Sequence, residues 1–262
     1  MRRLLLLTAV LFVGLANLIA HLRKEKQQQQ ILLATVMISI TTPNWQQMAG
    51  GSEEALPIPP DEYRVMARAD GDVVADGLGT VVAQGDETLL ITHDHWSHFD
   101  EALGMVTFRA ADGTWLAEMK LRTFRQQLRY RDGGTMVLAA PDVLATAVPG
   151  KVLLHQTTAL STGDRVFLAQ QADNHVLIAE ARALTQTEKQ GVPVVRLQSE
   201  DGQVVGGDSG GGVWLNGRLA GTMWTKVMME DPVTGERQAT EMSVAAIYRC
   251  LCCQRKPVEQ DL

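Results

Sequence analysis

GDSGGGVW, residues 207–214, is the most informative stretch of this sequence. A serine between glycines can lie on a tight loop, because glycine adopts backbone angles that other residues avoid. Such a loop can point backbone N–H groups into one space, where they stabilise an oxyanion. A Gly-rich hairpin without chemistry would look the same, whereas a phosphate-binding loop would end in a Lys-Ser/Thr pair that is absent here. We therefore take Ser209 as a candidate nucleophile.

A second motif lies upstream, where residues 77–96 read GLGTVVAQGDETLLITHDHW. The two motifs together resemble the nucleophile loop, the Gly-x-Gly strand and the Thr-x-x-His segment of the chymotrypsin/trypsin family of serine proteases. His95 falls on the catalytic histidine of that family. It precedes Ser209 in the chain, which is the chymotrypsin order. The resemblance covers the chain from about residue 63 to residue 247.

The body of the chain reads as β-structure. From Tyr63 on, short apolar runs alternate with turn signals such as Asp112-Gly113 and Asn216-Gly217, and no long segment has a helical period. Many short strands at steady spacing indicate a sandwich or a barrel. The resemblance implies an all-β fold of two antiparallel β-barrels of the chymotrypsin type, with the site between them.

The chemistry that the resemblance implies is acyl transfer, so we expect a serine endopeptidase that hydrolyses peptide bonds. His95 takes the proton of Ser209, which attacks the scissile carbonyl and forms an acyl-enzyme. The backbone N–H groups of Gly207 and Ser209 would form the oxyanion hole, and Asp208 matches the structural aspartate of the family. The substrate would be a polypeptide, and no cofactor or metal is implied.

Three aspartates compete for the role of the triad acid, which lies between the histidine and the serine in this family. Asp112 is explained by its Asp-Gly turn. Asp142 follows Ala-Pro and reads as a turn residue. Asp132 precedes the apolar run TMVL in the right context, although Gly133-Gly134 intervenes. We predict Asp132 as the acid, with a simple Arg-Asp-Gly turn as the alternative.

The resemblance also indicates the specificity pocket. Gln203 lies six residues before Ser209, where the family places the floor of that pocket, and a neutral amide cannot pair with Lys or Arg. Lys226 falls near the pocket wall, where it would favour an acidic or small polar residue or simply point into water. Trp96 stands where many family members have a cysteine.

Two other function classes remain open. His93, His95 and His98 form a His-x-His-x-x-His cluster that resembles the first ligand motif of metallo-β-lactamase-like hydrolases and could bind zinc. That family needs an aspartate where Ser97 stands, and GDSGGG would then be unexplained. On the protease hypothesis, His93 and His98 are surface or loop residues. The third class is a catalytically inactive binding module on the protease fold.

The N-terminus carries an apolar run, Leu4–Leu22, close to the length of a membrane-spanning helix. We expect an uncleaved transmembrane anchor rather than a signal peptide. The protease domain would then be extracytoplasmic, because the family most often works there; secretion after signal cleavage is the alternative. The expected organisation is an anchor or signal region at 1–40, a linker at 41–62, a protease domain at 63–247 (barrels 63–147 and 148–247) and a tail at 248–262.

Composition narrows the remaining choices. The chain has 262 residues and a net charge of −6, with no basic stripe, so nucleic acid is not an expected partner. Its three cysteines, Cys250, Cys252 and Cys253, all lie in the C-terminal tail. The fold is therefore held by its apolar core and not by a framework of disulfides.

Overall fold

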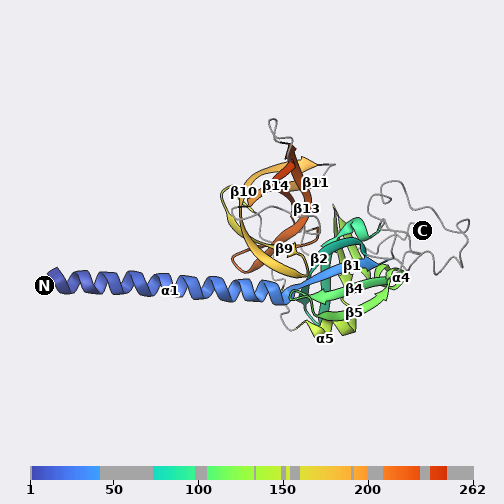
Figure 1. The fold of residues 1–262 in the computed structure, drawn as a ribbon, viewed down its shortest axis with the longest axis horizontal. Helices are drawn as coiled ribbons and strands as arrows, with labels where there is room; N and C mark the ends of the chain where they lie inside the picture. The colour runs from blue at the N-terminus through green and yellow to red at the C-terminus, as the bar shows by residue number, and fades with distance from the viewer. Residues whose placement is uncertain are drawn as a thin grey trace, which may run out of the picture.

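The chain forms two antiparallel β-structures, with a long N-terminal helix that projects away from them (Figure 1). The computed structural model describes residues 2–41, 73–97, 105–132, 134–148, 152–153, 160–189, 192–199, 209–230 and 237–246.

The first β-structure is an eight-stranded sheet in the order β5-β4-β1-β2-β3-β7-β6, with β8 beside β2. All its neighbours are antiparallel except the β2–β8 pair. Two helices of six residues each, α4 (Leu121–Gln126) and α5 (Asp142–Ala147), follow β5 and β7. The strands are β1 (Thr35–Thr41), β2 (Val73–Gln84), β3 (Glu87–His93), β4 (Met105–Ala110), β5 (Trp115–Lys120), β6 (Leu128–Asp132), β7 (Thr135–Ala139) and β8 (Val152–Leu153).

The second β-structure is a closed barrel in the order β10-β11-β14-β13-β12-β9. Its strands are β9 (Arg165–Ala172), β10 (His175–Lys189), β11 (Val192–Ser199), β12 (Gly212–Leu215), β13 (Arg218–Glu230) and β14 (Arg237–Ala246). The predicted fold class is confirmed: the protein is mostly β, with two antiparallel sheets, of which the second closes into a barrel.

One strand of the first sheet comes from the stretch expected to belong to the N-terminal region. Strand β1 lies between β2 and β4, where Ile38 pairs with Gly77 on one side and with Phe108 on the other. Its residues alternate between two cores, because successive side chains of a strand point to opposite faces. Val36 and Ile38 pack in the core of the first sheet, whereas Met37 faces the second barrel.

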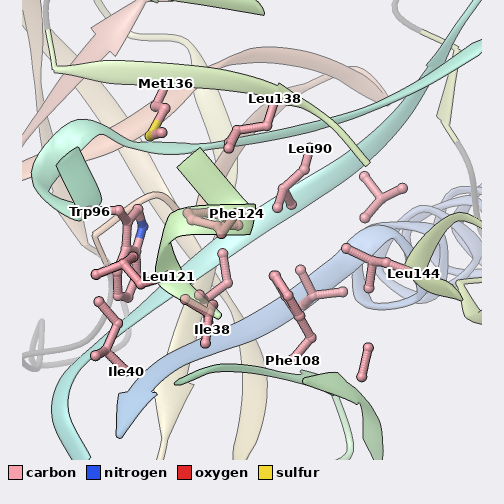
Figure 2. Close-up of a cluster of buried hydrophobic side chains, with 14 of the residues drawn as sticks. Ile38, Ile40, Leu90, Trp96, Phe108, Leu121, Phe124, Met136, Leu138 and Leu144 are labelled. Carbon is pink, nitrogen blue, oxygen red and sulfur yellow. The ribbon is translucent and has the colours of Figure 1, made fainter. Parts of the chain in front are cut away.

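The core of the first sheet gathers large side chains from its strands and from both short helices (Figure 2). Phe108 of β4 and Phe124 of α4 pack with ring centroids 5.8 Å apart, a favourable tilted arrangement. Trp96, which lies in the short turn after β3, is completely buried in the same cluster. This core therefore holds the segment that carries His95.

The N-terminal helix α1 spans Arg2–Ala34. The predicted transmembrane anchor is not supported, since no helix in the part of the chain that the structure describes is long and apolar enough to cross a membrane. Large apolar side chains between Leu11 and Leu22 are exposed, as expected for a helix that projects from the body.

The last turns of α1 pack between the two β-structures. Ile31 and Ala34 are buried in a third cluster, which joins Leu78 and Ile91 of the first sheet to Trp214 of the barrel. Further out, the ammonium group of Lys24 forms an ion pair with the carboxylate of Glu180 on β10. The helix end therefore belongs to the interface between the sheets.

We expect Ile31→Ala to lower the free energy of unfolding by about 2–5 kcal/mol, because Ile31 is 1% exposed and its loss leaves a cavity. The matched control is Ile19→Ala, the same substitution on the same helix at a position that is 41% exposed. That control should change stability by no more than about 0.5 kcal/mol. Urea denaturation measures both variants. Equal losses would contradict the buried position of Ile31.

Candidate active site

His95 lies on a short 3-10 turn, η2 (Asp94–Ser97), that follows β3. Ser97 Oγ donates a hydrogen bond of 2.7 Å to the carbonyl of Asp94 and closes the turn. The guanidinium of Arg125 on α4 donates to the carbonyls of Trp96 and Ser97, at 3.3 and 2.8 Å from Nη2. A cation thus satisfies the carbonyls at the end of the turn, and the backbone that carries His95 is held from both sides.

Trp96 links this turn to strand β2. Its indole Nε1–H donates to Thr92 Oγ1 over 2.9 Å, and Thr92 Oγ1 donates in turn to the carbonyl of Leu78 over 2.7 Å. The three side chains are fully buried. The indole also lies against Gly77, where an added Cβ would come within 2.7 Å of Trp96 Cζ2. The tryptophan at the position of the expected cysteine therefore ties the turn to β2 without a covalent bond.

Ser209 lies in the turn before β12, and its loop contacts both β-structures. Its carbonyl accepts a hydrogen bond of 2.8 Å from the backbone N–H of Leu78 in β2. The next two residues bind the barrel: Gly210 N–H donates to the carbonyl of Met223 in β13, and Met223 N–H donates to the carbonyl of Gly211. The candidate nucleophile is thus held between the first sheet and the second barrel.

Gly210, in the serine loop, packs directly against the first sheet. Its φ is +89°, a region that side chains disfavour. An added Cβ would lie 2.2 Å from the carbonyl oxygen of Leu78 and 2.6 Å from Thr92 Oγ1. Both the backbone angle and the lack of space therefore require glycine here.

His95 and Ser209 border one small space beside Gly77. An added Cβ at Gly77 would lie 3.3 Å from His95 Cε1 and 2.8 Å from the Ser209 carbonyl oxygen. One residue comes from the first sheet and the other from the loop that opens the second barrel, so the fold alone brings them together. Nucleophilic catalysis needs a histidine ring near the serine hydroxyl; the atoms that meet at Gly77 are the His95 ring and the Ser209 main chain.

Several predicted site residues stay predictions. Asp132 is the last residue of β6, but its side chain lies outside the described part of the structure, as does that of Lys226 in β13. Gly207, Gln203 and His98 lie outside the described residues altogether.

Asp112 and Asp142, the other two candidates for the triad acid, have local roles. The carboxylate of Asp112 accepts the backbone N–H of Thr114 over 2.9 Å, closing the predicted turn. Hydrogen bonds from Thr114 lower the pKa of Asp112 below its ordinary value. Asp142 is the first residue of α5, where a carboxylate is favourable beside the helix N-terminus. Neither observation connects these residues to His95.

His93 does lie beside His95, but the interpretation of it as a surface or loop residue is wrong. It is the last residue of β3, its side chain is 12% exposed, and its Nδ1 lies 2.8 Å from Nδ1 of His95. The alternation along β3 was the available signal. His93 shares a strand face with Leu89 and Ile91, which pack in the interface cluster, whereas Leu90 faces the opposite core.

The zinc hypothesis needs three ligands in one place. Within the described ranges, no three His, Cys, Asp or Glu side chains are grouped so that they could hold a metal ion. The third histidine of the motif, His98, is not among the described residues.

Comparisons with known proteins place this structure in one fold. The active form of the Rv3671c protease from M. tuberculosis has a TM-score of 0.51 and 18% identity, over 82% of this chain and 76% of that one. An inactive form of Rv3671c has a TM-score of 0.51 and 16% identity, over 86% and 89%. The HtrA-type protease AlgW with a tripeptide has a TM-score of 0.53 and 12% identity, over 84% of this chain and 58% of AlgW.

At these identities the likeness establishes the fold, which is that of chymotrypsin-like serine proteases. No protein-family model matches the sequence, and no curated protein does.

We expect Gly210→Ala to lower the free energy of unfolding by more than the strain of a positive φ alone, because the added methyl group also lacks space. The matched control is Gly163→Ala, because Gly163 has a φ of +92° but nothing within 4 Å of an added Cβ. The control should cost about 1–2 kcal/mol for the backbone angle. Gly210→Ala should cost about 1–3 kcal/mol more from overpacking against Leu78. Urea denaturation compares the two, and equal losses would contradict the close contact at Gly210.

Proposed function

We propose that this protein is a serine endopeptidase in which Ser209 is the nucleophile and His95 is the general base. The observation that carries the proposal is the meeting of these two residues beside Gly77, from opposite β-structures of a protease fold. The sequence motifs around both residues support the same roles. The AlgW structure contains a tripeptide, which fits a polypeptide as the substrate class here as well.

The mechanism follows from the chemistry of the pair. His95 Nε2 accepts the proton of Ser209 Oγ as the oxygen attacks the carbonyl carbon of the peptide bond. The tetrahedral intermediate collapses when His95 returns that proton to the leaving amine, and Ser209 is left as an ester. Water, activated by the same imidazole, then hydrolyses this acyl-enzyme and releases the second product.

Two further parts of the proposed mechanism rest on the family resemblance. The N–H groups of Gly207 and Ser209 would bind the oxyanion, a contribution worth about 3–4 kcal/mol for one donor in a related case. The resemblance assigns to Asp132 the role of accepting the Nδ1 proton of His95 and stabilising the imidazolium. The anchoring of the serine loop to both β-structures supports an organised oxyanion site, because its donors must be in place before the reaction.

Labelling with a fluorophosphonate probe tests the proposal directly. The parent should react at Ser209 and retain peptidase activity in a metal chelator. Ser209→Ala should not react, and its turnover should fall by about a million-fold, as for other serine triads.

The two other classes give different results in the same experiment. Loss of activity with chelator and its return with zinc would favour a metal-dependent hydrolase. A folded parent that neither reacts nor cleaves peptides would be a binding module on the protease fold, and the proposed function would be wrong.

We expect a specificity that is not trypsin-like, because Gln203 at the proposed pocket floor has no charge to pair with Lys or Arg. A peptide library, read by mass spectrometry, should show no dominant cleavage after basic residues. Gln203→Asp should move the preference toward Arg and Lys, since it adds the missing carboxylate. A strong basic preference in the parent would contradict the pocket assignment and leave the nucleophile assignment intact.

A further inference from the structure

The side chain of His93 lies against the imidazole of His95. The two Nδ1 atoms are 2.8 Å apart, and the ring centroids are 4.8 Å apart. The backbone N–H of His95 also donates to His93 Nδ1, over 3.0 Å. His93 is therefore bound to the proposed base twice, once through the ring and once through the main chain.

These two contacts determine which nitrogen of each ring carries a proton. A backbone N–H can only donate, so His93 Nδ1 must present its lone pair, and its ring proton must be on Nε2. Two lone pairs cannot face each other at 2.8 Å, so the proton between the rings belongs to His95 Nδ1. His95 then has an unprotonated Nε2, which is the tautomer that a general base needs.

We infer that His93 is the positioning residue of the active site, which accepts the Nδ1 proton of His95 and holds that ring in the basic tautomer. The inference rests on the proposed function and assigns to His93 the role that the resemblance assigned to Asp132. His93 does not touch the reacting atoms. It acts through His95, and its imidazole replaces a carboxylate as the acceptor.

The surroundings hold His93 in this position. Its backbone pairs with Thr135 of β7, and the following N–H, that of Asp94, donates to the carbonyl of Gly134 over 2.9 Å. The carboxylate of Asp94 lies 3.8 Å from His93 Nδ1, but it accepts hydrogen bonds of 3.1 and 3.0 Å from Arg131. Among the residues that the structure describes, the ion pair of Asp94 with Arg131 and the ring of His95 lie next to His93.

The backbone of Asp132 is further away. Strand β7 lies between β3 and β6, and Thr135 of β7 pairs with His93 on one side and with Asp132 on the other. Neighbouring strands lie about 4.8 Å apart, so roughly 10 Å separates the backbones of Asp132 and His93. His93 is two residues from His95 on the same segment. The contact of 2.8 Å between the two Nδ1 atoms supports the acceptor that is nearer along the chain.

An imidazole acceptor leads to a distinctive pH profile. A carboxylate acceptor is ionised throughout the range in which histidine titrates, whereas His93 works only while it is neutral. Protonation of either His93 or His95 stops the reaction as the pH falls. The acid limb of kcat/KM should therefore approach a slope of two protons, where a carboxylate acceptor would give one.

The test compares His93→Leu with His93→Asn in the full chain. Asn Oδ1 is attached to Cγ as Nδ1 is in histidine, so it can accept the same two hydrogen bonds, whereas leucine can accept none. His93→Leu should lower kcat by about a thousand- to ten-thousand-fold with little change in KM, the effect of losing the correct tautomer. His93→Asn should retain kcat within about ten-fold, and its acid limb should have a slope of one.

Asp132→Asn is measured beside them, and thermal unfolding establishes that each variant is folded. The inference is overturned if His93→Leu keeps the parent rate, if folded His93→Asn and His93→Leu lose activity equally, or if Asp132→Asn alone gives the large loss. Should the leucine variant fail to fold, the slopes of the parent and His93→Asn decide. A parent that does not react with fluorophosphonate would instead show that the proposed function is wrong.

Discussion

The hydrogen bond from the Leu78 N–H to the Ser209 carbonyl is the interaction on which the site depends. It joins a strand of the first sheet to the loop that opens the second barrel, and Leu78, which donates it, is fully buried. Leaving such a donor unpaired costs about 1–3 kcal/mol, so the loop has a strong preference for one position. The carbonyl of the same residue accepts the Thr92 hydroxyl. Leu78 therefore contacts both halves of the site. Its N–H binds the loop of Ser209, and its carbonyl binds the side chain of Thr92, which precedes the turn of His95.

The contacts around Trp96 hold the turn of His95 in place by packing, as a disulfide would do in a relative with a cysteine at this position. No cysteine lies between residues 63 and 247, so the turn that carries His95 can be held only by non-covalent contacts. The indole fills the space beside Gly77, and its N–H donates a hydrogen bond to Thr92 Oγ1. Each hydrogen bond contributes about 1 kcal/mol net to folding, but these are buried and share atoms, so they are stronger as a network.

The fold could be predicted because its strand-and-turn pattern is local, whereas the pairing of His95 with Ser209 came from the resemblance to the chymotrypsin/trypsin family and stays a prediction. Glycines on either side of Ser209 and the strand-and-turn pattern before His95 are visible in the sequence, and Gly210 has the positive φ that such a loop requires. The place of β1 could not be predicted with the same certainty, since its alternating faces belong to two cores that exist only after folding. His93 was misjudged for a related reason. The alternation along β3 indicated that its side chain points inward, but its ring contact with His95 depends on the 3-10 turn that follows β3.

The packing between the two β-structures couples the N-terminal helix to the segments that carry His95 and Ser209. Ile31 of α1, Ile91 of β3 and Trp214 of β12 pack in one cluster. The element that carries each of these residues adjoins part of the site. Helix α1 leads into β1, β3 leads into the turn of His95, and the loop of Ser209 leads into β12. Close-packed interiors transmit displacement because they have few voids to absorb it. A change in how the N-terminal helix packs would therefore reach both candidate catalytic residues, so the helix is part of the scaffold that aligns them.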